Sequence, residues 1–236
     1  MMFTLFREYL VENKIKLASK RSQEERLSKK EIAQAKRNQR YIDFFKKYVD
    51  GGSKGDVTPS KIDSRQEKLP DFVKKIGGNF SLKDSDITEL PENFLIEGDF
   101  YVGNAKIEKL PDGLHVKGNL TIANGYHDEI ILGDNTTVDG SIILDVNDVS
   151  GDSVLYKIGK NLTVGGDMQV HDHELFSLID GLHVKGNLDI SYVQTSSLPN
   201  DLKVEGDLDI RGTGVQNDVV ARKQLKYGYV KGKIYW

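Results

Sequence analysis

The chain has 236 residues, of which 29% are charged and 38% are hydrophobic, and its formal net charge is −3. These values are ordinary for a soluble protein and leave room for one domain with an appendage. The absence of cysteine excludes disulfides and thiolate metal sites. No apolar run reaches about 18 residues, so we expect no membrane span. The N-terminus lacks a basic-then-apolar pattern, so we expect no secretion through a cleaved signal peptide.

Residues 1–50 form a basic arm on an otherwise acidic chain. They contain thirteen Lys and Arg against seven Asp and Glu, or +6, and the remainder carries −9. Apolar spacing predicts amphipathic helices over 2–17 and 22–49. The basic run is either a solvated helix face or a site for an acidic surface or nucleic acid. The residues that would make that contact are Lys29, Lys30, Lys36, Arg37 and Arg40.

Two further predictions concern the end of the arm and the segment that follows it. The Phe and Tyr residues of 41–48 are predicted to dock on the first coil of the following domain as a cap, because exposed solenoid ends need covering. Residues 51–66, rich in Gly, Ser, Lys and Asp, predict a linker. We therefore place the domain boundary between 50 and 67.

Residues 67–236 repeat a short pattern whose core is Val-x-Gly followed by Asn or Asp. The glycine of this core recurs at intervals between 20 and 26 residues. It is found at Gly78, Gly98, Gly118, Gly140, Gly166, Gly186, Gly206 and Gly232. A period near 20 that is sustained this long indicates a solenoid.

Each repeat has a physical logic. Leu-Pro opens a segment that cannot be helical, and Gly before Asn or Asp permits a tight bend. The alternation that follows predicts Leu120 and Ile122 inside and Thr121 outside. One coil cannot bury its apolar row alone, whereas stacked coils can. The segment 229–236 repeats the core once more, which predicts a C-terminal cap.

The stretch from Phe100 to Pro111 reads apolar-x-apolar-x-x-small-x-Ile-x-x-Leu-Pro. It resembles the Leu-Pro-type leucine-rich repeat, whose usual form is LxLxxNxLxxLP. The resemblance implies an α+β repeat protein: a right-handed leucine-rich-repeat-like solenoid with a parallel sheet on one face, preceded by the basic N-terminal helical arm. It also implies a binding scaffold. The usual asparagine position is occupied by Ser85, Ala105, Val193 and Thr213, so no regular asparagine ladder is expected there.

Enzyme chemistry has little support in the sequence. Acidic residues follow the repeat, so no general acid and base pair stands out, and we predict a non-enzymatic protein with no cofactor. The string from His171 to Glu174 is the one metal-like motif, because residues two apart on a strand share a face. A surface loop explains it equally, and no metal site is predicted.

The outward side chains of the parallel strands form the best candidate surface. Aspartates gather toward its C-terminal end, where they are either simply solvated or part of a face that prefers a basic or mixed-charge protein partner. The candidate binding residues are Tyr101, Asp167, Gln169, Asp189, Asp207, Asp209 and Arg211.

The stretch from Met1 to Glu12 resembles the N-terminal capsid-targeting peptides of internal head proteins in large contractile-tailed bacteriophages. Leu-Pro repeats of this Gly-Asn/Asp style are also similar to ones common in phage genomes. These resemblances imply a phage-encoded protein-binding module that acts in the virion or on a host protein. The alternative they imply is a structural, capsid-associated component anchored by its arm. The expected location is the host cytoplasm or the virion, with a protein partner, no membrane, and nucleic acid only through the arm.

Overall fold

The computed structural model describes residues 29–58, 65–123, 129–145, 155–170, 176–178, 180–195, 197–217, 225 and 229–236. The chain divides into two compact units, 1–50 and 51–236. In the described residues, no helix has both the length and the hydropathy needed to cross a membrane.

The first unit contains helix α3 (Lys29–Asp50). Its aromatic residues cluster near the C-terminal end, where the rings of Tyr41 and Phe45 are buried and meet edge to face at 5.0 Å. Lys36 and Arg40 are exposed, and the half-buried Arg37 donates a hydrogen bond to Gln34. The expected helix over 2–17 lies outside the described residues, and docking of 41–48 on the first coil stays a prediction.

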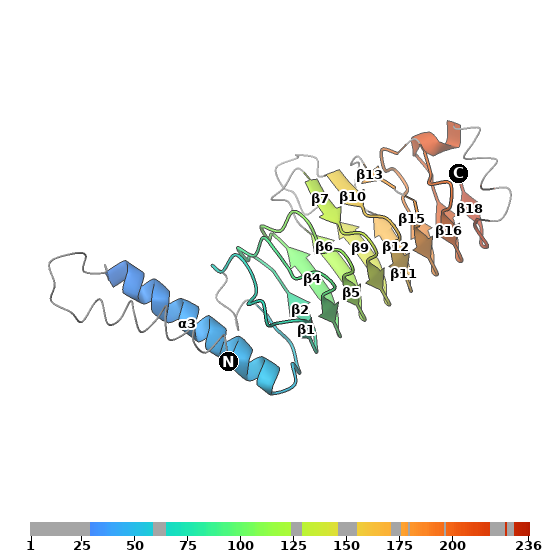
Figure 1. The fold of residues 1–236 in the computed structure, drawn as a ribbon. Coiled ribbons are helices and arrows are strands. Elements are labelled where there is room, and N and C mark those ends of the chain that lie inside the picture. Colours follow the sequence, from blue (N-terminus) through green and yellow to red (C-terminus); the bar gives the residue numbers. More distant parts are fainter. Residues whose placement is uncertain are drawn as a thin grey trace, which may run out of the picture. The chain divides into compact units, whose positions relative to one another are not determined.

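The second unit is a parallel β-solenoid whose coils stack so that equivalent strands pair (Figure 1). One side is a seven-stranded sheet. Its strands are β1 (Lys75–Ile76), β3 (Leu95–Ile96), β5 (His115–Val116), β8 (Thr137–Val138), β11 (Thr163–Val164), β14 (His183–Val184) and β16 (Lys203–Val204). A second side is an eight-stranded sheet. Its strands are β2 (Phe80–Ser81), β4 (Phe100–Gly103), β6 (Leu120–Ala123), β9 (Ile142–Asp145), β12 (Met168–Val170), β15 (Leu188–Asp189), β17 (Leu208–Asp209) and β18 (Ile234–Tyr235).

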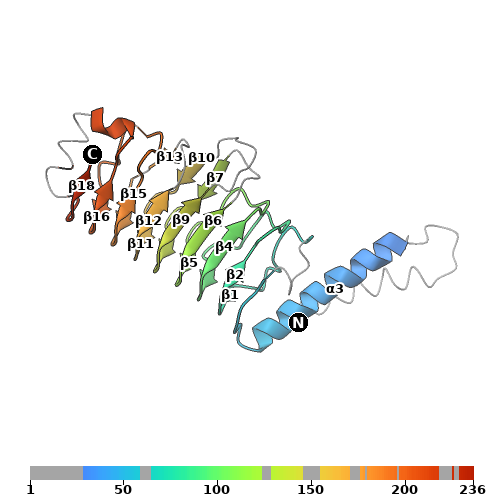
Figure 2. The ribbon, with the colours of Figure 1, turned by 180° about the vertical axis from the view of Figure 1, so that it is seen from behind.

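A third, shorter sheet joins β7 (Glu129–Leu132), β10 (Leu155–Ile158) and β13 (Phe176–Ser177). A 3₁₀ helix, η2, spans Gly214–Asn217 near the C-terminal end. Figure 2 shows the same rows of strands from behind, with the third row above the middle coils.

The register places each repeat directly on the next. Phe100 pairs with Leu120, and Leu120 pairs with Ile142. Leu120 and Ile122 are fully buried whereas Thr121 is only half-buried, so the predicted inside-outside alternation is confirmed. The core is therefore a set of apolar ladders that run along the solenoid, one residue from each coil.

The solenoid has two long parallel sheets where the sequence predicted a sheet on one face. The reason lies on either side of the glycine of each repeat. His115 and Val116 form β5 before Gly118, and Leu120 begins β6 after it. Gly118 and Asn119 make the corner between them, so one repeat contributes a strand to each sheet.

The stack also begins earlier than the sequence indicated. Residues 51–58 belong to the predicted linker 51–66, yet Lys54 bridges to Gly77 and Val57 bridges to Phe80, both in parallel. Val57 is fully buried. The segment carries a single apolar residue beside its Gly-Asp step, and one apolar residue gives no periodic signal.

The corners carry a continuous row of side-chain acceptors, which we call the Asx row. It consists of Asp56, Asn79, Asp99, Asn119, Ser141, Asp167, Asn187 and Asp207. The Oδ1 of each Asp or Asn, or the Oγ of Ser141, accepts a hydrogen bond from the backbone N–H one coil further on. The distances are 2.7–3.0 Å, and the row ends at the N–H of Lys233. Each coil therefore fixes the position of the next.

The glycine before each Asx-row residue from Asn79 onward makes room for this bond. A Cβ at Gly118 would lie 2.4 Å from Asp99 Oδ1 and 2.6 Å from the carbonyl carbon of Gly98. Both distances are far inside van der Waals contact, so a side chain there would push the coils apart. The repeated Gly-Asx pair is thus a steric requirement of stacking.

Charge along the Asx row is spaced out. Every aspartate in the row has only Asn, Ser or Lys as its neighbours in the row, as Asp99 has Asn79 and Asn119. Adjacent strands lie about 4.8 Å apart, and like charges directly opposite each other destabilise a sheet. Asn119 Nδ2 also donates to Asp99 Oδ1 at 3.2 Å.

We predict that Asn119→Asp lowers the free energy of unfolding by about 1 kcal/mol in low salt, because it places two carboxylates on adjacent rungs. The loss should shrink in about 1 M salt, which screens exposed charges. Asn119→Ser is the matched control, since Ser141 shows that a hydroxyl can accept the same bond. Urea unfolding at both salt concentrations measures the difference, and an equal loss at both would contradict charge repulsion as its cause.

Candidate functional site

The outer face of the eight-stranded sheet changes character along the solenoid. Its central outward positions form what we call the outer row. The row consists of Ser81, Tyr101, Thr121, Ile143, Gln169, Asp189, Asp209 and Tyr235, paired by register. Small and apolar residues dominate the N-terminal half, and acidic or aromatic ones follow from Asp189.

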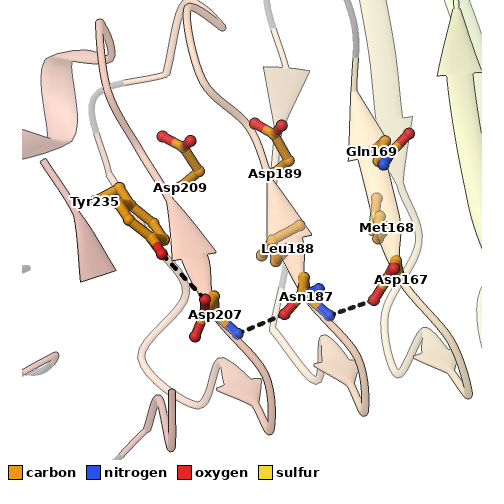
Figure 3. Close-up of a pocket in the computed structure, with 9 residues that line it drawn as sticks. All are labelled: Asp167, Met168, Gln169, Asn187, Leu188, Asp189, Asp207, Asp209 and Tyr235. Atoms are coloured by element: carbon orange, nitrogen blue, oxygen red, sulfur yellow. Dashed lines mark hydrogen bonds between the residues drawn. The ribbon is translucent and has the colours of Figure 1, made fainter. Parts of the chain in front are cut away.

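A hollow of about 220 Å³ lies on this face at the C-terminal coils, and we call it the groove. It is lined by Asp167, Met168, Gln169, Asn187, Leu188, Asp189, Asp207, Asp209 and Tyr235 (Figure 3). In Figure 3, Gln169, Asp189 and Asp209 form one line across the strands, and Asp167, Asn187 and Asp207 form a second. The outer row and the Asx row thus supply the two sides of the groove.

The structure gathers most of the predicted binding residues at this groove. Five of the seven line it, and they are Asp167, Gln169, Asp189, Asp207 and Asp209. Arg211 lies beside it, bonded to Asp209. Tyr101 lies on β4, which β9 and β6 separate from the nearest lining strand. Their role in binding stays a prediction.

Asp209 is held by an arginine of the same coil. Arg211 Nε lies 3.0 Å from Asp209 Oδ1, and Nη2 lies 2.5 Å from Oδ2. These charge-assisted hydrogen bonds hold the pKa of Asp209 below its usual value and raise the pKa of Arg211. The guanidinium also lies 5.7 Å from the centre of the Tyr235 ring, within the range of a cation–π contact.

The other groove carboxylates form no salt bridge among the described residues, although Arg211 also attracts Asp189 at longer range. Asp167 Oδ1 accepts from the N–H of Asn187, and Asp207 Oδ1 accepts from the N–H of Lys233. Asp207 Oδ2 accepts from the hydroxyl of Tyr235 at 3.3 Å, and Asp189 Oδ1 accepts from the N–H of Ser191. These are bonds from neutral groups, so the groove keeps an excess of negative charge.

Exposed aromatic side chains collect at the same end of the solenoid. Among the described residues, the large hydrophobic side chains that are exposed are Tyr192, Tyr235 and Trp236, at 59%, 41% and 45%. Tyr192 has a left-handed backbone, with φ of 62°, which is uncommon for a bulky residue and costs free energy. A Cβ at Gly212 would lie 2.5 Å from Tyr192 Cδ1, so the missing side chain of Gly212 leaves space for this ring.

The sequence interpretation did not single out Tyr192 or Tyr235. Tyr192 lies at a corner, outside the strand alternation on which the candidate surface was based, and Tyr235 lies in the terminal coil, which was interpreted only as a cap. The sequence signal that could have pointed to Tyr192 is Gly212, which lies one coil later and has no side chain to occupy the space of the ring.

The outer face of the seven-stranded sheet differs, because its charges pair with one another. Lys117 Nζ lies 3.3 Å from Glu97, and His115 lies 3.1 Å from Asp139. Glu205 accepts from Lys231 at 2.9 Å and from His183 at 2.9 Å, and these bonds lower the pKa of Glu205. The charges of this face therefore fit the interpretation that they are simply solvated surface ion pairs.

No group of three or more His, Cys, Asp or Glu residues that could hold a metal ion exists within the part of the chain that the structure describes. The metal-like string 171–174 and the segment 1–12 lie outside that part. Comparison with protein-family models, with curated proteins and with solved structures found no match to this chain.

Proposed function

We propose that the solenoid is a non-enzymatic protein-binding module that contacts its partner through the outer face of the eight-stranded sheet, at the C-terminal coils. The observation that supports it most is that the exposed aromatic side chains of the described residues, Tyr192, Tyr235 and Trp236, all belong to the last coils, with Tyr235 lining the groove. Aromatic residues are enriched at the centres of interfaces, where they carry much of the binding energy.

The scaffold under this surface is rigid. Asx-row hydrogen bonds of 2.7–2.8 Å and parallel strand pairing join each groove coil to the next, so the groove residues are held in place before a partner arrives. A preorganised surface loses less entropy on binding. The negative charge of the groove favours a partner with a basic or mixed-charge surface, and it would also speed the encounter.

The repeat type and biological setting are part of the proposal. The coil is a right-handed solenoid of the Leu-Pro leucine-rich-repeat type, encoded by a phage and acting in the virion or on a host protein. The sequence resemblances support this setting. A capsid-associated structural role anchored by the arm is the alternative that they imply, and detection of the protein in purified particles by mass spectrometry would favour that role.

The binding proposal predicts that capture of a partner depends on one face. Tyr192→Asn with Tyr235→Ser should reduce capture from host lysate about tenfold relative to the unchanged chain, because interface aromatics are often dominant. Asn suits the left-handed backbone at 192. The matched control is Lys185→Ser with Lys203→Ser, two exposed residues on the side of the seven-stranded sheet, Lys203 in β16 and Lys185 directly after β14.

The quantity of each captured protein is compared by mass spectrometry across the three chains. A protein that is retained by the control and lost by the tyrosine variant supports the proposal. Equal capture by all three chains would contradict it, provided that their melting temperatures agree.

A further inference from the structure

The repeat register makes the surroundings of Asp189 and Asp209 nearly identical. The two residues pair directly between β15 and β17. Each accepts a backbone N–H from the residue two further on, at 2.9 Å from Ser191 and at 3.1 Å from Arg211. The two carboxylates are therefore held in the same local turn, one coil apart.

The two positions differ in what covers the carboxylate. The guanidinium of Arg211 donates hydrogen bonds to both carboxylate oxygens of Asp209, and it lies against the ring of Tyr235 from the next coil. The equivalent residue after Asp189 is Ser191, which is too short to do this. Among the described residues, Asp189 Oδ2 accepts no hydrogen bond. Asp189 thus has the geometry of an arginine acceptor with no arginine hydrogen-bonded to it in the described residues, and Arg211 of the next coil acts on it only through longer-range attraction.

The neighbourhood of Asp189 suits a guanidinium from outside the chain. Asp207 and Asp167 add negative charge on the Asx-row side of the groove. Tyr192, three residues after Asp189 in the chain, has an exposed ring that lies against Gly212 of the next coil. A planar guanidinium can fork onto a carboxylate and stack on an aromatic ring, whereas an ammonium offers only a point charge.

We propose that this part of the groove, centred on Asp189, receives an arginine side chain from an extended segment of the protein partner. The inference rests on the proposed function and names the chemistry of the partner at that site. The internal pair of Arg211 and Asp209 shows the arrangement that the incoming arginine reproduces one coil earlier. Charge complementarity with the groove selects a basic segment over an acidic one.

The probe for this proposal is an unstructured peptide in which every second residue is arginine and the residues between them are glycine or serine. Its affinity for the full chain is compared with that of peptides carrying lysine or citrulline at the same positions. Citrulline keeps the shape and removes the charge. We expect binding about tenfold weaker for the citrulline peptide and several-fold weaker for the lysine peptide. Only arginine combines a positive charge with two N–H donors that can bind both oxygens of one carboxylate.

Three variants locate the contact. Asp189→Asn keeps the acceptor for the Ser191 N–H and should weaken arginine-peptide binding about fivefold to tenfold. Ser191→Arg supplies the missing internal arginine and should weaken it similarly. Asp99→Asn removes the same charge from the far end of the Asx row, where Asn79 and Asn119 occupy the neighbouring rungs, and should leave binding within about twofold.

Equal weakening by Asp99→Asn and Asp189→Asn would show diffuse attraction and overturn the proposal, as would equal binding of arginine and lysine peptides. If these peptides fail while the tyrosine variant still loses a captured protein, the arginine assignment is wrong and the binding face stands. If the peptides behave as expected while no captured protein depends on the tyrosines, the arginine site stands and the wider protein-binding role fails.

Discussion

Leu120→Ala is expected to lower the free energy of unfolding by about 2–5 kcal/mol, whereas Thr121→Ala should cost well under ~1 kcal/mol. Leu120 is fully buried on β6 and stacks between Phe100 and Ile142. The cavity left by alanine cannot close easily, because corner hydrogen bonds on both sides hold the spacing of the coils. Thr121 is half-buried on the outer face, so its methyl group loses little.

Urea unfolding of the two variants and the unchanged chain measures this difference. A solenoid can unfold in segments, so far-UV circular dichroism and tryptophan fluorescence should be recorded together to test for a single transition. Equal losses for the two variants would contradict the observed burial.

The stacking could be predicted from sequence because its cause is local. A Gly-Asx step followed by an apolar alternation recurs at nearly constant spacing, and constant spacing maps equivalent residues onto adjacent rungs. Gln169, Asp189 and Asp209 are neighbours in the outer row for this reason alone. The constant spacing alone was enough to predict that these side chains would lie together, and no loop structure had to be known.

Other features could not be predicted from the sequence pattern, for physical reasons. Strands of two residues, such as β5, are too short for alternation to show. The coil at 53–57 is held by backbone bridges and by the Asp56 acceptor, with Val57 as its buried apolar side chain. The sequence pattern placed Asp167 and Asp207 on the outward strand face, whereas both lie at corners and accept hydrogen bonds in the Asx row. This acceptor geometry becomes visible only when coils are stacked.

Deleting residues 229–236 should lower the melting temperature by about 5–15 °C and cause self-association. The terminal coil accepts backbone hydrogen bonds from Val204, Leu208 and Ile210. Each bond contributes about 0.5–1.5 kcal/mol, and for a chain of this size each kcal/mol corresponds to about 2–4 °C. The deletion also removes Ile234 from its place against Leu208, which bares the end of an apolar ladder.

The newly exposed edge explains the expected self-association. Once β18 is gone, β17 presents unpaired backbone groups that can pair with another chain, and Lys231 and Lys233 no longer flank the edge. Removal of Trp236 alone is the control, because β18 ends at Tyr235 and keeps its pairing with β17. Differential scanning calorimetry and light scattering measure both effects. A truncated chain that stays monomeric with an unchanged melting temperature would show that the last coil does not stabilise the stack.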